Sequence, residues 1–177
     1  ACAGNFKDAG LEYTGALKVL QMIFSYEYLW IQIRVKGGAY GCMCSFSDQG
    51  DSMFVTYRDP NLSESYKVYD EAADYVADFD ADDRDMKKYI IGTIGSMDMP
   101  MEAVDMGARS FHAYFLGKTE ADLQKVRDQV LSCTQEDIRA LAPIVKAVVE
   151  AGNRCCIGNE EKIDQNKEYF DEVKHVL

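Results

Sequence analysis

The chain has 177 residues, of which 47% are hydrophobic and 28% are charged. This composition is typical of a single globular domain with a sizeable core, and it excludes an intrinsically disordered chain. A net charge of −11 argues against nucleic-acid binding, which needs a basic surface, and no apolar run approaches the ~18 residues of a membrane helix.

The first third of the chain predicts two helical stretches followed by a β-hairpin. Apolar residues recur at helical spacing from about Thr14, and Tyr28, Leu29 and Ile33 continue a second helical stretch that stops at Gly37, so Arg34 lies in the last helical turn. Alternation over residues 40–47 predicts a strand. The segment 48–51 then predicts a turn into a second strand over residues 53–58.

The rest of the chain predicts mainly helices with clear start signals. Asn61, followed by Glu64, is typical of an N-cap. Capping-box patterns begin two further helices at Thr134 and Thr119. The expected elements are helices from residue 61 to about 76, at about 83–97 and 101–116, from 119, and from 134 to Gly152, a short strand at 154–157 and a terminal helix from Asn159 toward Phe170.

These elements predict one α+β domain over residues 1–177, with helices packed on one face of a mainly antiparallel sheet. The recognisable strands are few for a stable sheet, because an isolated hairpin is marginal. We therefore expect further strands upstream of Ala1.

Six cysteines without a C-x-x-C pair predict reduced thiols, and hence the cytoplasm or another reducing compartment such as an organellar matrix. The two histidines form no ligand pair, and the chain has no H-E-x-x-H motif or its inverse, so we expect no metal site. The acidic stretch from Asp78 opens like a calcium loop. It lacks the required sixth-position glycine, because Asp83 stands there.

One segment combines hydrogen-bond donors with a flexible backbone. Gly37 and Gly38 can both adopt positive φ and allow a second main chain to approach closely. Arg34 offers a fork of donors for carbonyl or carboxylate oxygens, and the neutral phenol of Tyr40 can donate to a developing oxyanion. The alternative is structural: Arg34 and Gly37 end a helix, and Tyr40 is an ordinary strand aromatic.

This segment also carries a family resemblance. The stretch from Tyr28 through Arg34 and Gly37-Gly38-Ala39-Tyr40-Gly41 to Tyr57-Arg58-Asp59-Pro60-Asn61 resembles the C-terminal, fourth domain of the presequence-protease subfamily of pitrilysin and insulinase zinc metallopeptidases. The resemblance covers nearly the whole chain. The Arg-x5-Tyr element is its most specific part.

The resemblance implies a fold and a function. The fold would be that of a mitochondrial processing peptidase-like metallohydrolase domain, and four such domains would enclose a chamber in which unstructured peptides are cleaved. The zinc site would lie in the first domain, so this chain would bind no metal and would be inactive alone. Arg34, Gly37, Gly38 and Tyr40 would contact substrate, with Arg34 holding a main-chain carbonyl and Tyr40 stabilising the oxyanion.

The expected partners are therefore unstructured peptides and the remaining domains of the same peptidase, without nucleic acid or membrane. Two alternatives stay open. A non-catalytic peptide-binding or assembly subunit of the same fold is expected if the upstream sequence has no H-x-x-E-H motif. A stand-alone acidic enzyme, suggested only by the acidic residues between Asp70 and Asp85, would require tight calcium binding there.

Overall fold

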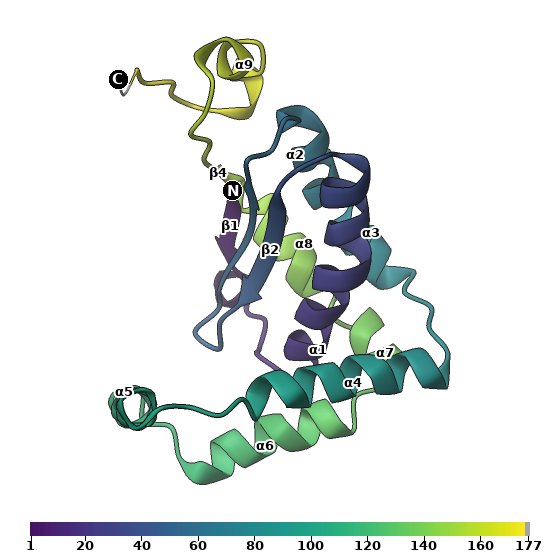
Figure 1. Cartoon of the computed structure of the whole chain (residues 1–177), viewed down its shortest axis with the longest axis vertical. Helices are drawn as coiled ribbons and strands as arrows, with labels where there is room; N and C mark the ends of the chain where they lie inside the picture. Colours follow the sequence, from purple (N-terminus) through teal and green to yellow (C-terminus); the bar gives the residue numbers. More distant parts are fainter. Residues whose placement is uncertain (176–177) are drawn as a thin grey trace.

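The computed structural model describes residues 1–175 and contains one antiparallel sheet in the strand order β2-β3-β1-β4 (Figure 1). The predicted hairpin is present as β2 and β3. The strands are β1 (Cys2–Asn5), β2 (Gly41–Phe46), β3 (Asp51–Tyr57) and β4 (Asn153–Arg154).

Strand β1 was missed by the sequence analysis, although it lies inside the sheet between β3 and β4. Its four residues, Cys-Ala-Gly-Asn, are too short and too poor in β-branched or aromatic side chains to form a recognisable pattern. One of the strands that the sheet needs is therefore β1, which lies within this chain. The existence of further strands upstream of Ala1 stays a prediction.

Helices cover one face of this sheet, where α1 and α8 lie against β2 and β1, and this confirms the α+β prediction (Figure 1). Two predicted helices are each divided in two. In chain order the helices are η1 (Phe6–Ala9), α1 (Ala16–Ile23), η2 (Phe24–Tyr28), η3 (Trp30–Lys36), α2 (Leu62–Asp70), α3 (Ala72–Ala77), α4 (Asp83–Met97), α5 (Ala103–Phe115), α6 (Glu120–Leu131), α7 (Gln135–Arg139), α8 (Ala142–Glu150), α9 (Glu160–Asp164) and η4 (Lys167–Tyr169).

The core lies between the sheet and the long helix formed by α1, η2 and η3. Phe24 packs against Phe46 of β2 and Phe54 of β3, with ring centroids 6.4 and 5.7 Å apart. All three rings are buried. Burial of each such side chain contributes about 1.5–3 kcal/mol, so these contacts hold the long helix across the sheet.

The long helix changes its hydrogen-bonding pattern part-way. It is α-helical to Ile23, and π-helical in η2 and η3, where the amide of Leu29 donates to Phe24 O and that of Gly37 to Gln32 O. The second helical stretch ends at Gly37 as predicted, although its hydrogen bonds are those of a π-helix. π-helical turns are rare in proteins, and those that occur are often found at functional sites. Here they end directly before the glycine pair.

Several predicted helix starts are confirmed. Thr119 and Thr134 both form capping boxes, and the Asn159 side chain accepts from the Lys162 amide. The terminal helix is shorter than expected, since α9 ends at Asp164 and a 3-10 turn follows. Asn61 occupies the N-cap position of α2 as predicted, but its side chain makes no capping hydrogen bond.

All six cysteines are free thiols. Among residues 1–175, no helix combines the length and apolar character that a bilayer crossing requires.

Candidate functional site

Arg34 and Tyr40 lie together at the surface where η3 turns into β2. The Arg34 Nε donates to the carbonyl oxygen of Tyr40 at 3.3 Å. Both side chains are exposed, with 67% of Tyr40 accessible to solvent. The two predicted site residues are therefore adjacent and turned outward rather than into the core.

The chain reverses between them through two glycines that play different parts. Gly38 has a φ of 78°, whereas Gly37 has a helical φ of −80°, so only Gly38 uses the positive φ that both glycines can adopt. A Cβ on Gly37 would instead lie 2.5 Å from the carbonyl oxygen of Ile33. Gly37 thus allows the close packing of the last helical turn, and Gly38 allows the left-handed turn that follows.

Aromatic rings hold the side chains of the pair. The Arg34 guanidinium lies 4.3 Å from the centroid of the Trp30 ring, four residues earlier on η3. The Tyr40 ring packs edge-on against Tyr57 of β3, with centroids 5.9 Å apart. This contact limits the positions that the Arg34 guanidinium can take, because cation–π attraction is strongest over the face of the ring.

Arg58 is a further residue of this surface, and the sequence analysis gave it no role. It has a φ of 49°, and its carbonyl accepts from the Tyr40 amide at 3.2 Å. Its guanidinium lies 5.8 Å from the Tyr40 ring centroid and 5.3 Å from that of Tyr57. A left-handed non-glycine residue is uncommon and costs on the order of 1–2 kcal/mol, which makes this turn a strained part of the surface.

Asn61 ties the start of α2 to the same turn. Its Nδ2 donates to the carbonyl oxygen of Gly37, and its backbone amide donates to the Asp59 carboxylate at 2.9 Å. The Asn61 side chain therefore positions the glycine turn instead of capping α2. Local sequence patterns do not reveal this contact, because Gly37 lies 24 positions away.

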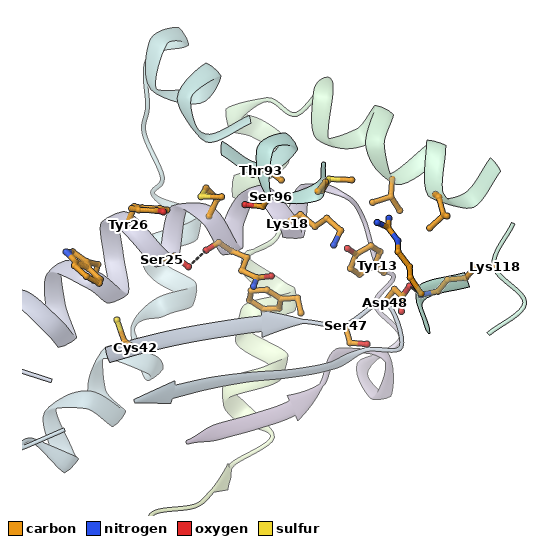
Figure 2. A pocket seen from close by; sticks show the side chains of 18 residues that line it. Tyr13, Lys18, Ser25, Tyr26, Cys42, Ser47, Asp48, Thr93, Ser96 and Lys118 are labelled. Atoms are coloured by element: carbon orange, nitrogen blue, oxygen red, sulfur yellow. Dashed lines mark hydrogen bonds and ion pairs between the residues drawn. The ribbon is translucent and has the colours of Figure 1, made fainter. Parts of the chain in front are cut away.

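A cavity of about 1000 Å³ lies beside this surface, between α1, β2 and the helices α4 and α6 (Figure 2). Trp30 and Cys42 line it, whereas Arg34 and Tyr40 do not. Burial raises the pKa of the Cys42 thiol, and the nearby Arg34 charge opposes that rise. The cavity thus reaches the immediate neighbours of the Arg34–Tyr40 pair.

Comparison with known proteins decides the family. The PreP C-terminal domain family matches residues 1–159. The chain belongs to this family.

Similar proteins are much longer than this PreP C-terminal domain. The chain is 41% identical over its whole length to Protein HypA of Clostridium perfringens, of which it covers 18%. It is 34% identical to Presequence protease 1, chloroplastic/mitochondrial, of Arabidopsis thaliana, over 99% of this chain and 17% of that protein. The mitochondrial presequence protease of Aspergillus fumigatus is also 34% identical, over 82% of this chain and 13% of that protein. The chain thus spans less than a fifth of the length of these relatives.

The donor sets needed for a metal are not assembled in the part of this PreP C-terminal domain that the structure describes. Among residues 1–175, no three His, Cys, Asp or Glu side chains are grouped closely enough to hold an ion. This includes the acidic stretch between Asp70 and Asp85. The described residues therefore offer no such set of ligands for a zinc or calcium ion.

Proposed function

We propose that this PreP C-terminal domain is part of a zinc metalloendopeptidase of the pitrilysin and insulinase class that degrades unstructured oligopeptides, presequences among them. In this proposal Arg34 and Tyr40 bind the substrate main chain, and the zinc is held by another domain. The family and the names of the presequence-protease relatives support the peptidase role. The single observation that supports the residue roles is the outward-facing pair of donors on one stiff turn.

The pair is suited to stabilising charge on a peptide carbonyl. Among the hydrogen bonds of residues 1–175, Arg34 makes one through Nε, which leaves its two Nη groups available, and the Tyr40 hydroxyl makes none. Donors that are already oriented cost no reorganisation when the oxyanion forms. Tyr40 would donate to that oxygen, and Arg34 would bind a neighbouring carbonyl.

The sheet edge beside the pair suits an extended peptide. β2 is an outer strand of the order β2-β3-β1-β4, so among residues 1–175 one side of its backbone has no partner strand. An unstructured peptide can add to such an edge through main-chain hydrogen bonds. Substrate recognition would then depend on an extended conformation more than on side-chain sequence.

The other expected partners are the remaining domains of the longer polypeptide. The six free thiols suit a reducing compartment, either cytoplasm or an organellar matrix. The names of the Arabidopsis and Aspergillus relatives favour the organellar matrix.

Kinetics of the full-length polypeptide test this proposal. Tyr40→Phe keeps the ring contacts and removes one oxyanion donor, so kcat should fall by about 10²–10³-fold with little change in KM. Arg34→Lys should also impair cleavage, because an ammonium cannot reproduce the planar fork. Tyr114→Phe is the matched control, since Tyr114 is an exposed tyrosine on α5. Wild-type turnover by Tyr40→Phe would remove that residue from the mechanism.

A further inference from the structure

The cavity beside the Arg34–Tyr40 pair carries an excess of positive charge. Its charged lining residues are three cations and one carboxylate, namely Lys18, Arg109, Lys118 and Asp48. The other lining residues are uncharged. A local surplus of two positive charges stands out in a chain whose net charge is −11, and it favours an anionic ligand.

One of these cations has no partner. Lys118 forms an ion pair with Asp48, but within residues 1–175 no acceptor lies within hydrogen-bonding or ion-pair distance of the Lys18 ammonium. Lys18 is half-buried, and its pKa is lowered by burial, with Asp48 opposing and Arg109 and Lys118 adding to that effect. A partly desolvated ammonium without a carboxylate at ion-pair distance is unfavourable, so a ligand carboxylate would be stabilising here.

The cationic residues occupy one end of the cavity. Figure 2 shows Lys18, Tyr13, Asp48 and Lys118 gathered there, while Cys42 lies at the opposite end. Cys42 and Asp48 are six residues apart, but β2 ends at Phe46 and Asp48 lies in the turn that follows, so the two residues are at most roughly 20 Å apart. The cavity can therefore hold at most about five or six residues of an extended peptide.

We propose that the Lys18 end of this cavity binds a peptide carboxylate, from the C-terminus or an acidic side chain, while the same peptide reaches Arg34 and Tyr40 five or six residues away. The second contact rests on the proposed function, whereas the first does not. Lys18 and Arg109 supply the donors, and the Lys118–Asp48 pair closes the end of the cavity. A peptidase built in this way selects where it cleaves by the distance from a carboxylate.

The only tryptophan of the chain reports on this cavity. Trp30 lines it and is 39% exposed, so its fluorescence should respond to a bound peptide. The 177-residue chain is titrated with three N-acetylated Ala/Gly hexapeptides: a free acid, its C-terminal amide, and an amide with one terminal Glu. The free acid or the Glu amide should bind about tenfold or more tightly than the neutral amide, and added salt should reduce this difference.

Variants locate the carboxylate. Lys18→Met should abolish the difference between acid and neutral amide. Arg109→Met, at an exposed position where the fold is not at risk, should weaken it. Lys146→Met is the control, because this exposed lysine of α8 pairs with Glu150 and lies outside the cavity. Equal binding of all three peptides, or an undiminished difference in both Lys18→Met and Arg109→Met, would overturn the carboxylate site.

A fourth variant separates this inference from the proposed function. In calorimetric titrations, Arg34→Ala should weaken binding of the hexapeptide acid and leave that of a tripeptide acid unchanged, because only the longer peptide spans the cavity. Unchanged hexapeptide binding in Arg34→Ala, with the acid–amide difference intact, would support the carboxylate site and remove the contact to Arg34.

Discussion

The two glycines between Arg34 and Tyr40 should respond differently to substitution. Gly37 has a backbone conformation that alanine adopts freely, but its Cβ would lie 2.5 Å from Ile33 O and 3.2 Å from Gln32 O. Gly38 has a φ of 78° in open space, with Pro60 Cγ as the nearest atom at 3.8 Å. The obstacle is therefore steric at Gly37 and conformational at Gly38.

The expected costs follow from these obstacles. Gly37→Ala must move a main-chain carbonyl, which costs about 1–3 kcal/mol of unfolding free energy by analogy with overpacked cores. Gly38→Ala should cost about 1–2 kcal/mol for the left-handed conformation. Gly95→Ala is the matched control, because Gly95 lies within α4 with no atom within 4 Å of its added Cβ. That change should stabilise the chain by about 0.4–1 kcal/mol.

Urea unfolding and thermal melting of the 177-residue chain measure these differences, and 1 kcal/mol corresponds to about 2–4 °C in Tm. Asparagine separates the two mechanisms. It tolerates left-handed backbone, so Gly38→Asn should cost less than Gly38→Ala, whereas Gly37→Asn should be at least as harmful as Gly37→Ala. A neutral Gly37→Ala, or a rescue by asparagine at that position, would refute the steric argument.

Two other perturbations test features that hold the site in place. Asn61→Ala should lower the unfolding free energy by about 1 kcal/mol, because it removes the hydrogen bond to Gly37 O. Asn61→Ser keeps a good N-cap residue, but its side chain is shorter, so urea unfolding should show that the lost stability is not restored. Full recovery of stability in Asn61→Ser would show that capping is the real role. Burial raises the pKa of Tyr13 to about 12, above its ordinary value near ~10. Folding thus favours its neutral form, so the contribution of Tyr13 to the unfolding free energy should be constant below pH ~10 and be lost between pH ~10 and ~12. Tyr13→Phe should make the fall in unfolding free energy over this range smaller; identical pH curves for the two proteins would contradict the shift.

Local patterns were sufficient for much of the fold. The turn at residues 48–51 and the alternation on either side predicted the β2–β3 hairpin, and Thr119 and Thr134 predicted their helix starts. Helix α4 has the predicted limits of Asp83 and Met97. These patterns involve residues two to four positions apart, so they can be recognised in the sequence without knowledge of tertiary contacts.

Part of the site was also predictable. The six-residue separation of Arg34 and Tyr40 around a glycine pair placed both near one turn, and the structure brings them into contact. The stacking of Arg34 on Trp30 was not predicted, although their spacing of four residues on a helix was a usable signal. Arg58 offered no comparable signal, since its contact with Tyr40 comes from the pairing of β2 with β3.

The amino-acid sequence by itself determined the helices, the hairpin, the α+β class and the donors at the glycine turn. Tertiary structure decided the role of Asn61, the strand identity of β1 and the gathering of Lys18 with Lys118 at one end of a cavity. These features join residues 24, about 50 and 100 positions apart. They are stabilised by hydrogen bonds and ion pairs between distant segments, and local sequence periodicity does not reveal such contacts.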